Sequence, residues 1–178
     1  MTNGILTALV SIFIGMLKIG RKAPAFALKD QDGEIQQLKE QAGKWVLIYF
    51  YPKDDTPGCT KEACTIAEVY GDFKRLGVTV FGVSKDSVKS HKKFTEKYSL
   101  PFGLLADTES EMLTSYDVLV EKSMFGKKYV GIARVSYVVN PDGKIVAVYP
   151  DVDPATHAHT LLRDIKALKK TAKIASAA

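Results

Sequence analysis

The sequence contains few cysteines, and their number and spacing exclude several classes of protein. Among 178 residues only Cys59 and Cys64 are cysteines, five positions apart. A small secreted domain stapled by disulfides would carry more cysteines at wider spacings. The three histidines, His91, His157 and His159, are distant in sequence, so the two thiols lack the neighbours that a four-ligand zinc site needs. The pair is therefore interpreted as two reactive or two inert thiols.

The chain also carries little excess charge outside its last residues. The formal net charge is +5, and most of it comes from lysines that no acid follows: Lys166, Lys169, Lys170 and Lys173. Positive charge near the end of a helix is favoured by the helix dipole. No basic patch with interleaved aromatic residues accompanies these lysines, which argues against a nucleic-acid partner.

The sequence lacks an apolar run of standard membrane-spanning length, which is about 20 residues. The run over 5–17 has the length of a signal-peptide core, but no Lys or Arg precedes it and no A-x-A cleavage site follows. Met16 and the residues after it look like a natural start. We interpret residues 1–15 as an apolar extension, either an over-long start or a weak anchor. We expect a cytoplasmic protein, or a periplasmic or membrane-associated one if these residues belong to the mature chain.

Residues 16–170 are expected to form one domain, followed by a flexible tail over 171–178. Hydrophobic residues make up 46% of the chain, enough for a full core. Strand and helix signals alternate, which is typical of α/β domains. The apolar runs over 45–51 and 78–83 predict central strands buried on both faces. Turn signals at Asp32-Gly33 and over 140–143 predict hairpins. Helices are expected over about 59–76, 87–98 and 109–116, and from a cap at Asp153 onward.

This pattern predicts a thioredoxin-like three-layer fold, in which a central mixed β-sheet is flanked by helices and preceded by an N-terminal β-hairpin. Periodicity alone does not separate it from other three-layer α/β folds.

The loop over 52–58 joins a buried strand to a helix and places Cys59 in the first helical turn. Free backbone N–H groups and the helix dipole favour a thiolate there. Pro52 and Pro57 stiffen the loop, and Thr56 offers a hydroxyl that can donate a hydrogen bond to a ligand and accept one from a neighbour. Free cysteines are nevertheless commonly buried and inert, so position alone leaves both interpretations open.

Other polar residues of this region are expected to be ordinary surface residues. Lys53, Asp54 and Asp55 are interpreted as solvated loop residues, and His91 as exposed on a polar helix face. His157 and His159 are interpreted as unremarkable helix residues rather than metal ligands.

The loop resembles the active-site signature of the peroxiredoxins. Pro52, Thr56 and Cys59 match P-x-x-x-[T/S]-x-x-C, and the run over 56–60 with a second cysteine five positions on is similar to the bacterioferritin comigratory protein (PrxQ) subfamily. The segments over 17–26 and 126–137 also resemble that subfamily, and the likeness extends over about 16–168. Ala25 and Asn140 stand where acids are common, away from the expected chemistry.

The resemblance implies a role for each matched residue. Cys59 would be the peroxidatic nucleophile, Thr56 would hold the peroxide, and Pro52 would shield the pocket. Arg134 would favour the thiolate and stabilise the departing oxygen. It stands at the start of an apolar strand, where it is more constrained than an ordinary surface arginine. Cys64 would be the resolving thiol that closes a Cys59–Cys64 disulfide.

The implied activity is that of a thiol-dependent peroxidase serving antioxidant defence. Hydrogen peroxide or an organic hydroperoxide would oxidise Cys59 to a sulfenic acid, and thioredoxin or a glutaredoxin-type dithiol would reduce the resulting disulfide. No metal, flavin or haem is expected. A monomer is the default because resolution occurs within one chain. The alternatives are a thioredoxin-like thiol–disulfide oxidoreductase, which usually carries C-x-x-C, and a non-enzymatic α/β binding module with inert cysteines.

The spacing of the cysteines predicts a conformational change. On an intact helix, residues five apart have Cα atoms about 8.7 Å apart and side chains about 140° apart around the axis. A disulfide requires a Cα separation of roughly 4.4–6.8 Å. The helix from Cys59 to Cys64 is therefore expected to unwind during turnover.

Overall fold

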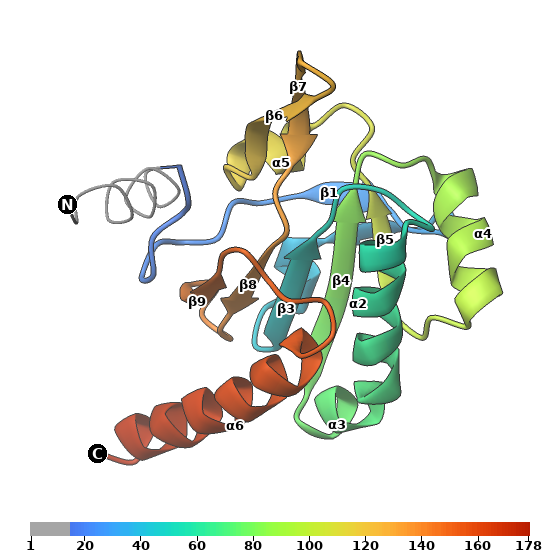
Figure 1. Ribbon diagram of the computed structural model, residues 1–178. Coiled ribbons are helices and arrows are strands. Elements are labelled where there is room, and N and C mark those ends of the chain that lie inside the picture. The colour runs from blue at the N-terminus through green and yellow to red at the C-terminus, as the bar shows by residue number, and fades with distance from the viewer. Residues whose placement is uncertain (1–14) are drawn as a thin grey trace.

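A five-stranded mixed sheet forms the centre of the protein (Figure 1). The computed structural model describes residues 15–178, so the expected extension lies outside the described residues except for its last one. The strand order is β5-β4-β3-β8-β9. Strands β3, β4 and β5 are parallel, while β8 is antiparallel to both β3 and β9. Their bounds are β3 (Trp45–Phe50), β4 (Val78–Ser84), β5 (Gly103–Ala106), β8 (Val135–Val139) and β9 (Ile145–Tyr149).

Within residues 15–178, two hairpins lie outside this sheet. The predicted N-terminal hairpin is confirmed as β1 (Ala27–Lys29) and β2 (Ile35–Gln37). A second one, β6 (Leu119–Met124) and β7 (Lys127–Ile132), was not among the sequence predictions and projects from the body of the molecule in Figure 1. A short 3-10 helix, η1 (Leu38–Gln41), follows β2. The helices are α2 (Pro57–Glu68), α3 (Tyr70–Arg75), α4 (Val88–Tyr98), α5 (Glu111–Ser115) and α6 (His157–Ser176).

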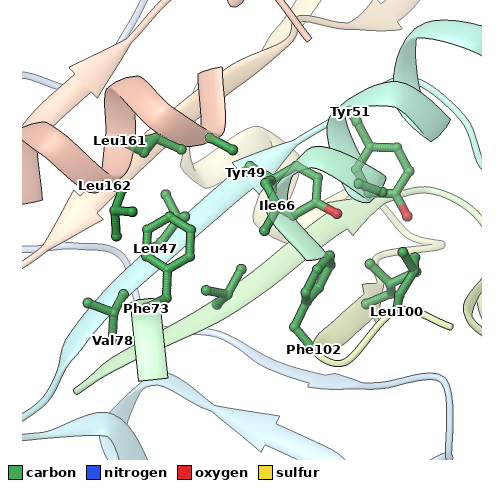
Figure 2. Packing of buried hydrophobic residues seen from close by; sticks show 14 of the residues in the cluster. Leu47, Tyr49, Tyr51, Ile66, Phe73, Val78, Leu100, Phe102, Leu161 and Leu162 are labelled. Atoms are coloured by element: carbon green, nitrogen blue, oxygen red, sulfur yellow. The ribbon is translucent and has the colours of Figure 1, made fainter. Parts of the chain in front are cut away.

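Strand β3 is buried on both faces, as its apolar run predicts. Side chains alternate along a strand, so Leu47 and Tyr49 join the cluster that Ile66 of α2 and Leu161 of α6 complete (Figure 2). The intervening residues face a second cluster, formed with α5 and the N-terminal segment. The fold class is therefore confirmed: α2 and α6 cover one face of the sheet, and α5 and the N-terminal segment cover the other.

The helices differ from the predictions at two places. The helix expected up to Gly77 is divided at Val69, whose carbonyl accepts hydrogen bonds from the N–H groups of Asp72 and Phe73. The last helix begins at His157 rather than at Pro154, because Asp153 caps a separate turn by accepting from the N–H of Ala155. Helix α6 continues to Ser176, through most of the segment expected as a tail. Within residues 15–178, none of the helices is long and apolar enough to cross a membrane.

Candidate active site

Cys59 lies in the first turn of α2 and contacts Arg134 across 75 positions of sequence. Its side chain is 2% exposed, and its Sγ accepts a hydrogen bond from Arg134 Nη2 at 3.2 Å. The sheet explains this contact. Phe50 at the end of β3 pairs with Val135 at the start of β8, so the loop leaving β3 and the residue preceding β8 lie at the same sheet edge. The guanidinium therefore places a positive charge directly beside the Cys59 sulfur.

Glu62 holds the other side of the Arg134 guanidinium. Its carboxylate Oε2 accepts from Arg134 Nη1 at 2.5 Å, and its side chain is fully buried. Burial raises the pKa of Glu62 to about 7, although the charge of Arg134 opposes this rise. The sequence interpretation missed Glu62. Its spacing from Cys59 and Ile66 on the buried face of α2 is the signal that would have found it.

Gly58 leaves the space that Arg134 occupies. A Cβ added at Gly58 would lie 3.1 Å from Arg134 Nη2, closer than ordinary van der Waals contact. Glycine before the cysteine therefore permits the close approach of the guanidinium to the start of α2.

A cavity of about 710 Å³ opens beside Arg134, and Pro52 lines it as well. Its volume lies within the range of small-molecule sites, about 300–1,000 Å³. Its other lining residues come from the N-terminal segment, from β6 and the loop before it, from the position before Arg134 and from the loop after β9. They are Gly15, Met16, Asp117, Leu119, Val120, Glu121, Lys122, Ala133 and Asp151. A small molecule in this cavity lies next to the Arg134 guanidinium.

Thr56 and Cys64 are close in the chain to this cluster, but within residues 15–178 neither side chain makes a hydrogen bond to Cys59, Glu62 or Arg134. Thr56 immediately precedes α2, and its hydroxyl donates to the carbonyl of Lys53 at 2.9 Å. Cys64 is half-buried farther along the same unbroken helix, and both thiols are free. Burial raises the pKa of Cys64, and the carboxylate of Glu68 adds to the rise. The structure thus brings together Cys59, Arg134 and Pro52, with Thr56 adjacent and Cys64 apart.

Two residues expected in solvent are instead buried: Asp54 in the loop that precedes Cys59, and His91 of α4. His91 is fully buried, and its Nδ1 lies 2.9 Å from Oδ2 of the buried Asp54. The His91 Nε2 lies 3.0 Å from the carbonyl of Leu105 and must carry a hydrogen, because a carbonyl only accepts. Asp54 also accepts from Tyr51 Oη at 2.6 Å and from Ser90 Oγ at 2.8 Å. The predicted exposure of Asp54 and His91 is therefore wrong, whereas Lys53 and Asp55 are exposed as expected.

The raised pKa of Glu62 predicts a pH dependence of stability. An acid whose pKa is raised in the folded state binds more protons folded than unfolded, so stability falls as pH rises from about 4.5 to about 7. Relative to Glu62→Gln, the wild type is expected to lose up to about 3 kcal/mol of unfolding free energy over this window. Urea denaturation at several pH values measures the difference. Parallel curves for both proteins would contradict the prediction.

Comparisons with known proteins agree with this geometry. The sequence matches the AhpC/TSA family over residues 19–148. It is 48% identical over 141 residues to a putative peroxiredoxin bcp of Coxiella burnetii, covering 79% of this chain and 93% of that protein. Among solved structures, the bacterioferritin comigratory protein of Xanthomonas campestris superposes with a TM-score of 0.79 at 36% identity, covering 84% of this chain and 98% of that one. A cysteine-to-serine mutant of PrxQ from Xylella fastidiosa gives a TM-score of 0.82 at 31% identity, with 86% and 98% covered.

The match spans most of the chain and includes the loop, helix and strand that bring Cys59 to Arg134. This family uses a thiol and an outside thiol reductant to reduce peroxides, which fits a buried cysteine held by a guanidinium beside a cavity. The chain therefore belongs to the AhpC/TSA family, and within it to the peroxiredoxins of the Bcp/PrxQ type, and is a thiol peroxidase.

Proposed function

We propose that Cys59 is the peroxidatic nucleophile and Cys64 the resolving thiol of this peroxidase. The observation that carries the assignment is the hydrogen bond from Arg134 Nη2 to Cys59 Sγ at the start of α2. The two thiols have different surroundings. Cys59 accepts a hydrogen bond from a guanidinium, while burial and the carboxylate of Glu68 raise the pKa of Cys64 more than Lys61 lowers it. The attacking form is the thiolate, and of the two thiols Cys59 is the one with a guanidinium beside it to stabilise the negative charge.

The first step forms a bond between sulfur and oxygen. Cys59 Sγ attacks one peroxide oxygen, the O–O bond breaks, and the departing oxygen takes up a proton and leaves as water or an alcohol. Arg134 stabilises negative charge on the sulfur and on the departing oxygen. We assign Pro52 the shielding of the pocket. Thr56 would have to turn its hydroxyl from the Lys53 carbonyl toward the peroxide to hold it.

The second step forms the disulfide. Cys64 Sγ attacks the sulfenic sulfur of Cys59, the S–O bond breaks and water leaves. A dithiol donor then reduces the Cys59–Cys64 disulfide by thiol–disulfide exchange, and we propose thioredoxin or a glutaredoxin-type protein for this role. We also infer a monomer acting in the cytoplasm, where such donors keep thiols reduced. The substrates proposed are hydrogen peroxide and organic hydroperoxides. The related Xanthomonas protein was studied for alkyl peroxide reduction.

Cys64→Ser tests the division of roles between the two cysteines. This variant is expected to consume about one peroxide per chain and then stop, because the sulfenic acid has no partner within the chain. Wild type supplied with thioredoxin, thioredoxin reductase and NADPH is expected to continue. Mass spectrometry of the oxidised wild type should identify a disulfide between Cys59 and Cys64. Sustained turnover by Cys64→Ser with thioredoxin would refute resolution by Cys64.

Closing that disulfide requires α2 to unwind, because the helix is unbroken from Pro57 to Glu68 in the dithiol form. Amide hydrogen exchange over 59–64 is expected to accelerate at least about tenfold in the oxidised protein. Far-UV circular dichroism should show a matching loss of helix. Cys64→Ser treated with the same peroxide is the control and should keep its protection. An equally protected helix in wild type after oxidation would contradict unwinding.

A further inference from the structure

A second cationic side chain, Lys122 of β6, lines the cavity next to Arg134. Lys122 is half-buried, and its Nζ donates to the carbonyl of Ile132 at 2.7 Å. Lys122 pairs with Tyr129 in the hairpin register, whereas Ile132 pairs with Leu119 at the hairpin base. The side chain therefore runs back along the hairpin toward its base instead of outward into solvent. The carbonyl that it reaches belongs to Ile132, which precedes Arg134 by two positions.

Gly131 provides the surface on which this side chain lies. A Cβ at Gly131 would lie 2.7 Å from Cδ and 3.1 Å from Cε of Lys122. Any larger residue at 131 would displace the methylene stem of Lys122. Glycine at this strand position therefore allows the ammonium to reach the hairpin base.

In the described part of the chain Lys122 has no ion-pair partner, although several charged residues line the cavity. The positive charge of Arg134 is opposed by buried Glu62. The acids that line the cavity, Asp117, Glu121 and Asp151, are exposed residues, and Glu121 pairs with Lys128 at 3.0 Å. Among the described residues no carboxylate lies within ion-pair distance of Lys122 Nζ. Burial lowers the pKa of Lys122, and the charge of Arg134 adds to this fall.

We propose that Lys122 supplies a second positive charge to the peroxidatic site and speeds the attack of Cys59 on the peroxide. This inference rests on the proposed role of Cys59. During attack, negative charge moves from Cys59 Sγ to the oxygen that leaves as the O–O bond breaks. An ammonium in the cavity that Arg134 also lines stabilises this charge. Lys122 acts through its charge, and variants that keep its side-chain stem separate the charge from the packing of that stem.

Lys122→Met tests the charge, because methionine keeps an unbranched apolar stem over Gly131. In a Cys64→Ser background, oxidation of Cys59 by hydrogen peroxide can be followed as a single turnover by stopped flow. Its second-order rate constant is expected to fall about fivefold in Lys122→Met. Lys122→Arg should restore it to within about twofold. Lys127→Met removes an exposed lysine of the same hairpin and should leave the rate unchanged.

Gly131→Ala tests the placement of the ammonium without removing it. The added Cβ displaces the flexible stem, so the same loss of rate is expected. The Lys122→Met/Gly131→Ala double variant should be no slower than Lys122→Met alone, because each change removes the same contribution of the Lys122 ammonium. Equal rates for Lys122→Met and its parent would overturn the proposal. So would failure of Lys122→Arg to rescue, or a loss confined to peroxides that carry a carboxylate.

Failure of this inference is distinguishable from failure of the proposed function. If Cys59→Ser retained peroxidase activity, the role of Cys59 would be wrong. If activity depended on Cys59 but not on the charge at residue 122, only the proposed role of Lys122 would be wrong.

Discussion

Cys59→Ser is expected to abolish peroxide reduction, with a loss of at least about a thousandfold in kcat/KM. A serine hydroxyl beside Arg134 Nη2 remains protonated at neutral pH and is a poor nucleophile toward peroxide oxygen. Peroxide consumption with thioredoxin, thioredoxin reductase and NADPH measures the loss. The side chain is nearly isosteric, so the position of Arg134 and the melting temperature should change little.

The two cysteines provide matched variants for this experiment. Cys64→Ser removes a thiol from the same helix but should retain the first turnover, whereas Cys59→Ser should lose that turnover too. Peroxide consumption by Cys59→Ser at the wild-type rate would refute the assignment of the nucleophile. Equal loss of the first turnover in both variants would refute the division of roles.

Asp54→Asn is expected to lower the free energy of unfolding by about 3 kcal/mol, because its amide NH2 takes the place of a buried carboxylate oxygen that accepts hydrogen bonds. Asp54 receives hydrogen bonds from Tyr51 and Ser90, and its own N–H donates to Asp86 Oδ2 at 2.9 Å. Urea denaturation measures the change. The carbonyl of Lys53, next in the chain, holds the Thr56 hydroxyl, so a looser loop should also slow peroxide reduction.

Asp55→Asn is the matched control for this variant. Asp55 is the adjacent acid, exposed and paired with Lys97 on the surface. Its backbone φ is +54°, a conformation that asparagine tolerates. Surface pairs contribute little to stability, so Asp55→Asn should change the unfolding midpoint only slightly. Equal destabilisation by both variants would show that the buried hydrogen bonds of Asp54 are not what stabilises the loop.

Local patterns predicted the parts of the fold whose causes are local. The apolar run of β3 and the turn at Asp32-Gly33 need only neighbouring residues to specify them. The β6–β7 hairpin escaped prediction because its turn residues are Phe125 and Gly126, both at positive φ. Asparagine or aspartate usually occupies the first of these positions, and phenylalanine there conceals the turn.

The buried polar residues were beyond the reach of such patterns. Asp54 in a polar loop and His91 on a helix rich in lysine read as surface residues by composition. They are buried because α4 packs against the loop after β3 and because each satisfies the other's hydrogen-bonding groups. Glu62 is likewise buried by its pairing with Arg134, 72 positions away.

The sequence by itself determined the fold class, the family and the candidate nucleophile, since Pro52, Thr56 and Cys59 lie in one continuous segment at the start of a predictable helix. Only the tertiary structure decided which charges meet that thiol. Pairing of β3 with β8 brings Arg134 to Cys59, and the β6–β7 hairpin directs Lys122 into the cavity that Arg134 also lines. These contacts depend on the register of strands far apart in the chain, which no local pattern specifies.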